Sequence, residues 1–95
     1  MVSRTEKEVA MVSAVSEVLR LRKEKGAMTP EEMMQDLTKF LKYTRGEEPK
    51  VLGVAAASKA LSMMHKNPAM SDKEVMGQMV RDFDSIIDQV ETEMM

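Results

Sequence analysis

The chain has 95 residues and carries 14 basic against 16 acidic side chains, a net charge of -2, with no cysteine. This length predicts one domain, residues 1–95, built around one core. The charge balance excludes the strongly basic field that drives non-specific nucleic-acid binding, and the lack of cysteine excludes disulfides, thiolate metal sites and cysteine nucleophiles.

Hydropathy gives no sign of a membrane or export segment. The sequence has neither an apolar run of the roughly 18 residues that a membrane span needs nor a signal-type apolar start. We therefore expect a cytoplasmic protein that does not act in a membrane. Its 12 methionines, against one Tyr and two Phe, predict a core filled by flexible thioethers and aliphatic side chains.

Helical periodicity recurs along the chain, whereas strand-type alternation and hairpin dipeptides are missing from the sequence. The predicted helices span about residues 4–25, 30–45, 50–65 and 72–92. Short connections between them favour an all-α fold, a small antiparallel four-helix bundle.

The first predicted helix begins at a capping box, either Ser3 with Glu6 or Thr5 with Glu8, and ends at Gly26. Its last turns carry four basic residues: Arg20, Arg22, Lys23 and Lys25. Cations at this position complement the negative end of the helix dipole. The same cluster is also a candidate phosphate-binding site.

The second predicted helix has a clear start, because Thr29 can cap it, Pro30 occupies its first position and Glu32 completes a capping box. Gly46 supplies a stop. The segment from Gly46 to Pro49 is predicted to be the main loop, dividing the chain into two helical hairpins.

The third predicted helix is apolar nearly all round, so we expect it to be the most buried of the four. Gly53, Ala57 and Ala60 lie on one side and carry almost no side chain, which allows a neighbouring helix to approach closely. Pro68 marks its end, since the residue before a proline disfavours helical geometry.

The fourth predicted helix opens with a capping box of Ser71 and Glu74 and has the most regular apolar pattern. Its apolar residues occupy the a, d and e positions expected of a core-facing bundle helix. Gly77 weakens it by about 1 kcal/mol relative to alanine unless a partner backbone lies against it.

The sequence predicts no catalytic residue, metal site or cofactor. The single histidine, His65, belongs to no Glu-x-x-His pair, and the isolated glycines form no phosphate-binding loop. Asp84, Asp88 and Glu91 share one helix face and are the best candidates for carboxylate chemistry. We interpret them as a solvated acidic face, and we expect the protein not to be an enzyme.

A methionine-rich apolar surface is the most unusual feature, because deformable Met surfaces are used to accept partner helices. The candidate partner-binding residues are Met63, Met64, Met76, Met79, Val80, Phe83, Ile87 and Val90. Core packing is the ordinary explanation for the same side chains.

These observations lead to one principal functional hypothesis and one alternative. The principal hypothesis is a non-enzymatic protein-protein interaction module, such as a regulator, adaptor or secretion-type chaperone, that binds another protein or a second copy of itself through the fourth helix. The alternative is a small nucleic-acid-binding or transcription-associated protein that uses the basic cluster at the end of the first helix, although the net charge disfavours nucleic acid.

Overall fold

The computed structural model describes residues 3–25, 29–42 and 46–94. These segments contain four α-helices, α1 (Arg4–Lys25), α2 (Pro30–Leu41), α3 (Glu47–Lys66) and α4 (Asp72–Met94). No strand occurs within them. The prediction of an all-α fold with four helices is therefore confirmed.

Side-chain caps define where three of the helices begin. At α2, the Glu32 N–H donates to Thr29 Oγ1 at 3.2 Å and the Thr29 N–H donates to Glu32 Oε1 at 3.3 Å. The Ser71–Glu74 pair repeats this reciprocal arrangement at α4, with both bonds at 3.2 Å. At α1, Ser3 Oγ accepts the backbone N–H three residues on. All three caps follow from local sequence.

The start of α3 differs from the prediction. Residues 47–49 were expected in a loop, but α3 begins at Glu47, immediately after Gly46 with its positive φ of 86°. Pro49 is tolerated because the N–H groups of a first helical turn have no partner inside the helix. Glu47 and Glu48 also complement the positive end of the helix dipole.

Two other helix ends also depart from the predicted bounds. The helix α2 ends at Leu41, with Lys42 as its C-cap, rather than continuing to residue 45. Residues 43–45 of the predicted helix lie outside the described residues. At the other end of the chain, α4 extends to Met94, beyond the predicted end at residue 92.

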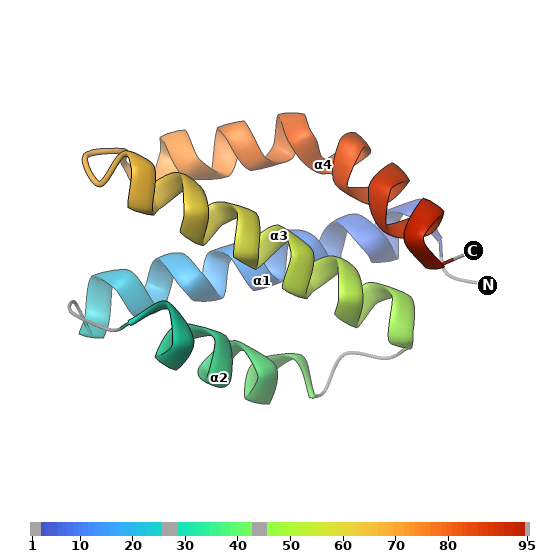
Figure 1. The fold of residues 1–95 in the computed structure, drawn as a ribbon, viewed down its shortest axis with the longest axis horizontal. Helices are drawn as coiled ribbons and strands as arrows, with labels where there is room; N and C mark the ends of the chain where they lie inside the picture. Colours follow the sequence, from blue (N-terminus) through green and yellow to red (C-terminus); the bar gives the residue numbers. More distant parts are fainter. Residues whose placement is uncertain (1–2, 26–28, 43–45, 95) are drawn as a thin grey trace.

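The helices α1 and α3 form a central pair with α2 and α4 on opposite sides of it (Figure 1). Each of the two central helices contacts all three other helices, whereas the described parts of α2 and α4 do not contact each other. The chain direction alternates from one helix to the next, so α1 and α3 run the same way (Figure 1). The helix α2 packs beside α3 on the side away from α4.

Small residues on α3 explain why α1 and α3 pack so closely. Gly53, Ala57 and Ala60 are all buried, and a Cβ added at Gly53 would lie 3.4 Å from the Cβ of Ala14 on α1. The predicted close approach along this side of α3 is therefore confirmed. Backbones can come together where side chains are this short.

The core is built from apolar side chains of all four helices. Within the described segments, no polar or charged side chain is buried, and no buried side-chain polar atom lacks a hydrogen-bond partner. None of the described helices has the length and apolar content required to cross a bilayer. The polar groups that could carry out chemistry therefore lie on the surface.

Candidate functional site

The structure places most of the predicted partner-binding residues of α3 and α4 inside the protein. The buried members of that set are Met64, Met79, Phe83, Ile87 and Val90. Met63 and Met76 are partly buried and pack against the core, while Val80 is 52% exposed. In this conformation, Val80 is the main apolar group that α4 offers to a partner.

The basic cluster at the end of α1 is largely occupied by carboxylates. Arg20 pairs with Glu17 and Glu24 on its own helix, and these contacts, led by the hydrogen bonding that Arg20 donates to Glu17, raise the pKa of Arg20. Arg22 donates to Asp72 Oδ1 at 2.5 Å and to the Met70 carbonyl oxygen at 3.2 Å.

The structure describes the side chain of only one of the two other members of that cluster. Lys23 is exposed, and the Lys25 side chain lies outside the described residues. Because neighbouring carboxylates balance both arginines, the described part of the cluster presents no concentrated positive charge to a phosphate.

Two of the candidate carboxylates on α4, Asp84 and Asp88, are exposed, whereas Glu91 is half-buried. Asp84 pairs with Arg4, and Glu91 pairs with Lys7, both on α1. The hydrogen bond from Lys7 lowers the pKa of Glu91. A general acid needs the opposite shift, a raised pKa, to be protonated near neutral pH. Across the described segments, no cluster of His, Asp or Glu is arranged to hold a metal ion.

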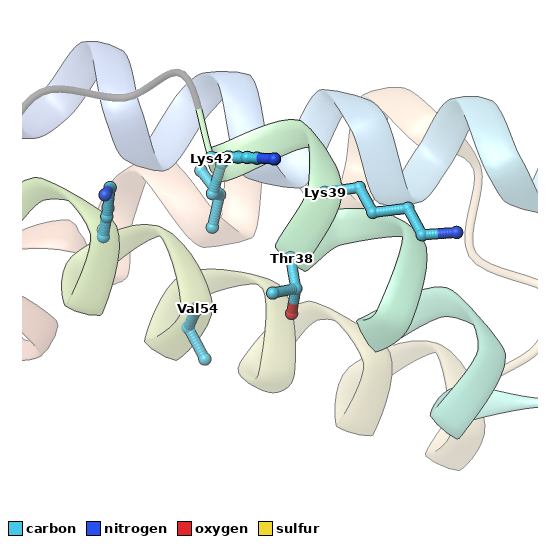
Figure 2. A pocket seen from close by; sticks show the side chains of 6 residues that line it. Thr38, Lys39, Lys42 and Val54 are labelled. Carbon is cyan, nitrogen blue, oxygen red and sulfur yellow. The ribbon is translucent and has the colours of Figure 1, made fainter.

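A hollow that was not predicted lies between the C-terminal half of α2 and the N-terminal half of α3. This hollow, the lysine-end pocket, has a volume of about 330 Å³ and is lined by Thr38, Lys39, Leu41, Lys42, Lys50 and Val54. Figure 2 shows Thr38 on α2 and Val54 on α3 on the two sides of the pocket, with the Lys39 and Lys42 side chains extending from α2. The Thr38 hydroxyl donates to the Met34 carbonyl oxygen at 2.8 Å, so its hydrogen is used within α2.

A second hollow lies between the same two helices, nearer the start of α2. This histidine-end pocket has a volume of about 370 Å³ and is lined by Pro30, Met34, Ser58, Leu61, Ser62 and His65. Its wall is mainly apolar, with two serine hydroxyls and the His65 imidazole as its polar groups.

The two pockets follow one seam and together form what we call the α2–α3 groove. On α2 the lining steps by four residues from Pro30 to Met34 to Thr38, and on α3 it steps by four from Val54 to Ser58. Residues four apart lie one above the other on a helix face. The lining residues therefore form two facing rows, one on each helix.

The charge of the α2–α3 groove is one-sided. No carboxylate of the described residues forms an ion pair with Lys39, Lys42 or Lys50. None of the described residues that line the two pockets is acidic. By contrast, five other cations have carboxylate partners: Arg4, Lys7, Arg20, Arg22 and Lys59. One end of the groove thus combines an apolar floor with three ammonium groups that form no ion pair with a described carboxylate.

One property of the sequence does indicate this groove, namely the apolar character of α3. A helix that is apolar nearly all round has more apolar surface than one neighbour can cover, and Val51 and Val54 of α3 are indeed exposed. The missing information was which helices would lie beside α3. That arrangement depends on packing between distant segments.

Comparison with known proteins yields no relative to guide the interpretation: the chain matches no protein-family model, no curated protein and no solved structure. The α2–α3 groove and the charged groups around it are therefore the features that can indicate a function.

Proposed function

We propose that this protein is a non-enzymatic interaction module that binds an amphipathic helical segment of another protein in the α2–α3 groove. The observation that carries the proposal is the alignment of two apolar pockets along one seam, with unpaired lysines at one end. Helix-in-groove recognition uses an apolar channel of this kind, entered by side chains from one face of the partner helix.

The dimensions of the groove fit a helix of about three turns. The twelve residue steps from Pro30 to Lys42 span about 18 Å at about 1.5 Å per residue. On α2, the residues that line the two pockets are centred eight positions apart, which is about 12 Å. Apolar residues at positions i and i+7 of a partner helix are about 10.5 Å apart, so each can enter one pocket.

The chemistry of the described residues supports a non-enzymatic role. The buried side chains are apolar, Asp84 and Asp88 are exposed, and the pKa of Glu91 is lowered rather than raised. A cysteine-free composition fits the reducing cytoplasm, where we propose that the module acts.

A host peptide with leucines at i and i+7 and neutral polar residues elsewhere tests the groove directly. Titrated into the full chain labelled with ¹⁵N, it should shift the amide resonances of α2 and α3 saturably and leave those of the outer face of α4 unchanged. Val54→Glu should weaken binding at least about tenfold, because the partner's leucine would meet a carboxylate whose burial is costly. Absence of saturable binding contradicts the proposed function.

Val80→Glu is the matched control, since it introduces the same charge at another exposed valine, on α4. We expect it to bind the peptide normally. If Val80→Glu abolishes binding and Val54→Glu does not, the docking surface is the α4 face predicted from the sequence. If the chain is instead a dimer that Val80→Glu dissociates, the partner of α4 is a second copy of the chain.

A further inference from the structure

The charges of the α2–α3 groove indicate which class of partner helix it binds. This inference rests on the proposed function. We infer that the partner segment carries a cluster of carboxylates at one end of its apolar face, and that this end lies against Lys39, Lys42 and Lys50. The three lysines border the apolar floor formed in part by Leu41 and Val54.

The geometry favours an acidic amphipathic peptide, because an apolar pocket and positively charged side chains occur in one place. Lys39 and Lys42 are exposed and Lys50 is half-buried, and none has a carboxylate partner among the described residues. A lysine stem can lie along apolar surface while its ammonium group stays in water. A partner helix that fills the lysine-end pocket with an apolar side chain brings the neighbouring turn within reach of these ammonium groups.

A nucleic-acid backbone fits the same lysines less well. Phosphate binding needs a row of cations and gains nothing from an apolar pocket between them. The chain as a whole is also slightly acidic, with a net charge of -2. An amphipathic acidic helix uses the lysines and the pocket together, so the observed combination points to that partner.

The opposite end of the α2–α3 groove differs in charge, and this difference predicts an orientation. The histidine-end pocket is lined by Met34, Leu61 and His65 among others, and none of its described lining residues is a lysine or an arginine. A partner with carboxylates at one end only should therefore bind with that end at the lysines. Charge complementarity of this kind fixes register as well as raising the association rate.

Three peptides that differ only at one end test the inference. All keep leucines at i and i+7, and the end beyond one leucine carries three Glu, three Gln or three Lys. At low salt, the Glu peptide should bind the full chain about tenfold more tightly than the Gln peptide, since three solvent-accessible ion pairs each contribute a factor of about two. The Lys peptide should bind more weakly than either.

Two triple variants, each of which removes three positive charges, identify the lysines that cause the preference for the Glu peptide. The triple variant K39Q/K42Q/K50Q should bind the Glu and Gln peptides with equal affinity, because the charges that favour the Glu peptide are gone. The control variant K23Q/K66Q/K73Q changes three exposed lysines that do not line the α2–α3 groove, and should keep the preference for Glu. Loss of the preference in both variants overturns the assignment to Lys39, Lys42 and Lys50.

The outcomes separate this inference from the proposed function. Equal binding of the Glu and Gln peptides overturns the acidic partner and leaves the helix-binding groove in place. Failure of all three peptides to bind overturns the proposed function itself. Salt-sensitive binding of duplex DNA that K39Q/K42Q/K50Q abolishes, with no preference among the peptides, overturns the inference in favour of a phosphate-binding surface.

Discussion

Gly53 on α3 lies directly against Leu41 on α2: a Cβ at Gly53 would be 3.1 Å from Leu41 Cδ2 and 3.3 Å from Cδ1. On its other side that Cβ would meet the Cβ of Ala14 on α1 at 3.4 Å. Gly53 therefore marks the point where three helices come together. Leu41 also lines the lysine-end pocket, so packing at Gly53 and the shape of the α2–α3 groove are coupled.

We expect Gly53→Val to destabilise the protein by about 1–3 kcal/mol, because the added methyl groups have no room between Leu41 and Ala14. Any displacement of Leu41 into the groove should also weaken peptide binding. Urea unfolding followed by circular dichroism measures the free energy of unfolding. Stability equal to that of the natural chain would show that α3 does not approach its neighbours this closely.

Gly77→Ala, at the other glycine within a described helix, should have the opposite effect on stability. An added Cβ at Gly77 meets no described atom within 4 Å, and Gly77 lies in the interior of α4. The substitution should therefore stabilise the protein by up to about 1 kcal/mol, through helix propensity alone. The same urea titration checks it, and a loss of stability would indicate a contact on this face that the isolated chain does not show.

Helix starts were predictable because their causes are local. Thr29 with Glu32 and Ser71 with Glu74 form reciprocal hydrogen bonds over three residues, and no distant part of the chain is needed. The start of α3 was missed because the segment from Gly46 to Pro49 was predicted to be a loop. A proline in the first turn removes only an N–H that the helix does not use.

The α2–α3 groove was not predictable from the sequence. Its lining residues come from two helices, and which helices lie side by side depends on tertiary packing. An apolar stripe such as that of α4 indicates that something covers it, but the pattern is the same for the core and for a partner. In the structure Met79 is covered by the core and Val80 is not. Met34 and Val54 become a site only because α2 and α3 lie side by side.

Thr29→Ala should destabilise the protein by about 1 kcal/mol, because the Glu32 N–H loses its acceptor at the start of α2. Thr29→Ser keeps the hydroxyl and should restore most of the stability. The control is Thr92→Ala near the end of α4, where the hydroxyl only donates to the Asp88 carbonyl oxygen, and the expected change is within about 0.5 kcal/mol. Thermal unfolding ranks the three variants, and equal effects at Thr29 and Thr92 would contradict the cap.

The adjacent residues Met79 and Val80 should respond oppositely to truncation. Met79 is fully buried, so Met79→Ala should cost about 2–5 kcal/mol of stability, whereas Val80 is 52% exposed and Val80→Ala should change it by less than about 0.5 kcal/mol. Urea unfolding at two protein concentrations makes the comparison. A large, concentration-dependent loss at Val80 would show instead that α4 is an interface between copies.

Stability should also depend on pH through the ion pairs that join α1 to α3 and α4. The Lys7 Nζ lies 3.0 Å from Glu48 Oε1 and also contacts Glu91. The hydrogen bonds that Lys7 donates to Glu91 and then to Glu48 raise the pKa of Lys7, and the bond to Glu91 lowers the pKa of that carboxyl group. Each shift means that the folded state favours the charged form of that group more than the unfolded chain does.

The direction of the pH effect follows from these shifts. Because the folded pKa of Glu91 lies below its ordinary value of 4.5, its contribution is complete above about pH 4.5 and is lost as the pH falls through the folded pKa. Lys7 contributes fully below its ordinary pKa of 10.5 and loses this contribution as the pH rises through the raised pKa. Melting temperature should therefore fall at both extremes of pH.

Glu91→Gln should lower the melting temperature at neutral pH and flatten its fall below about pH 4.5, because the variant has no carboxylate to protonate at this position. Glu93→Gln is the control, since Glu93 is exposed and forms no ion pair with another described residue. It should keep the pH profile of the natural chain. Identical profiles for Glu91→Gln and the natural chain would mean that the contact with Lys7 contributes nothing to the stability of the folded state.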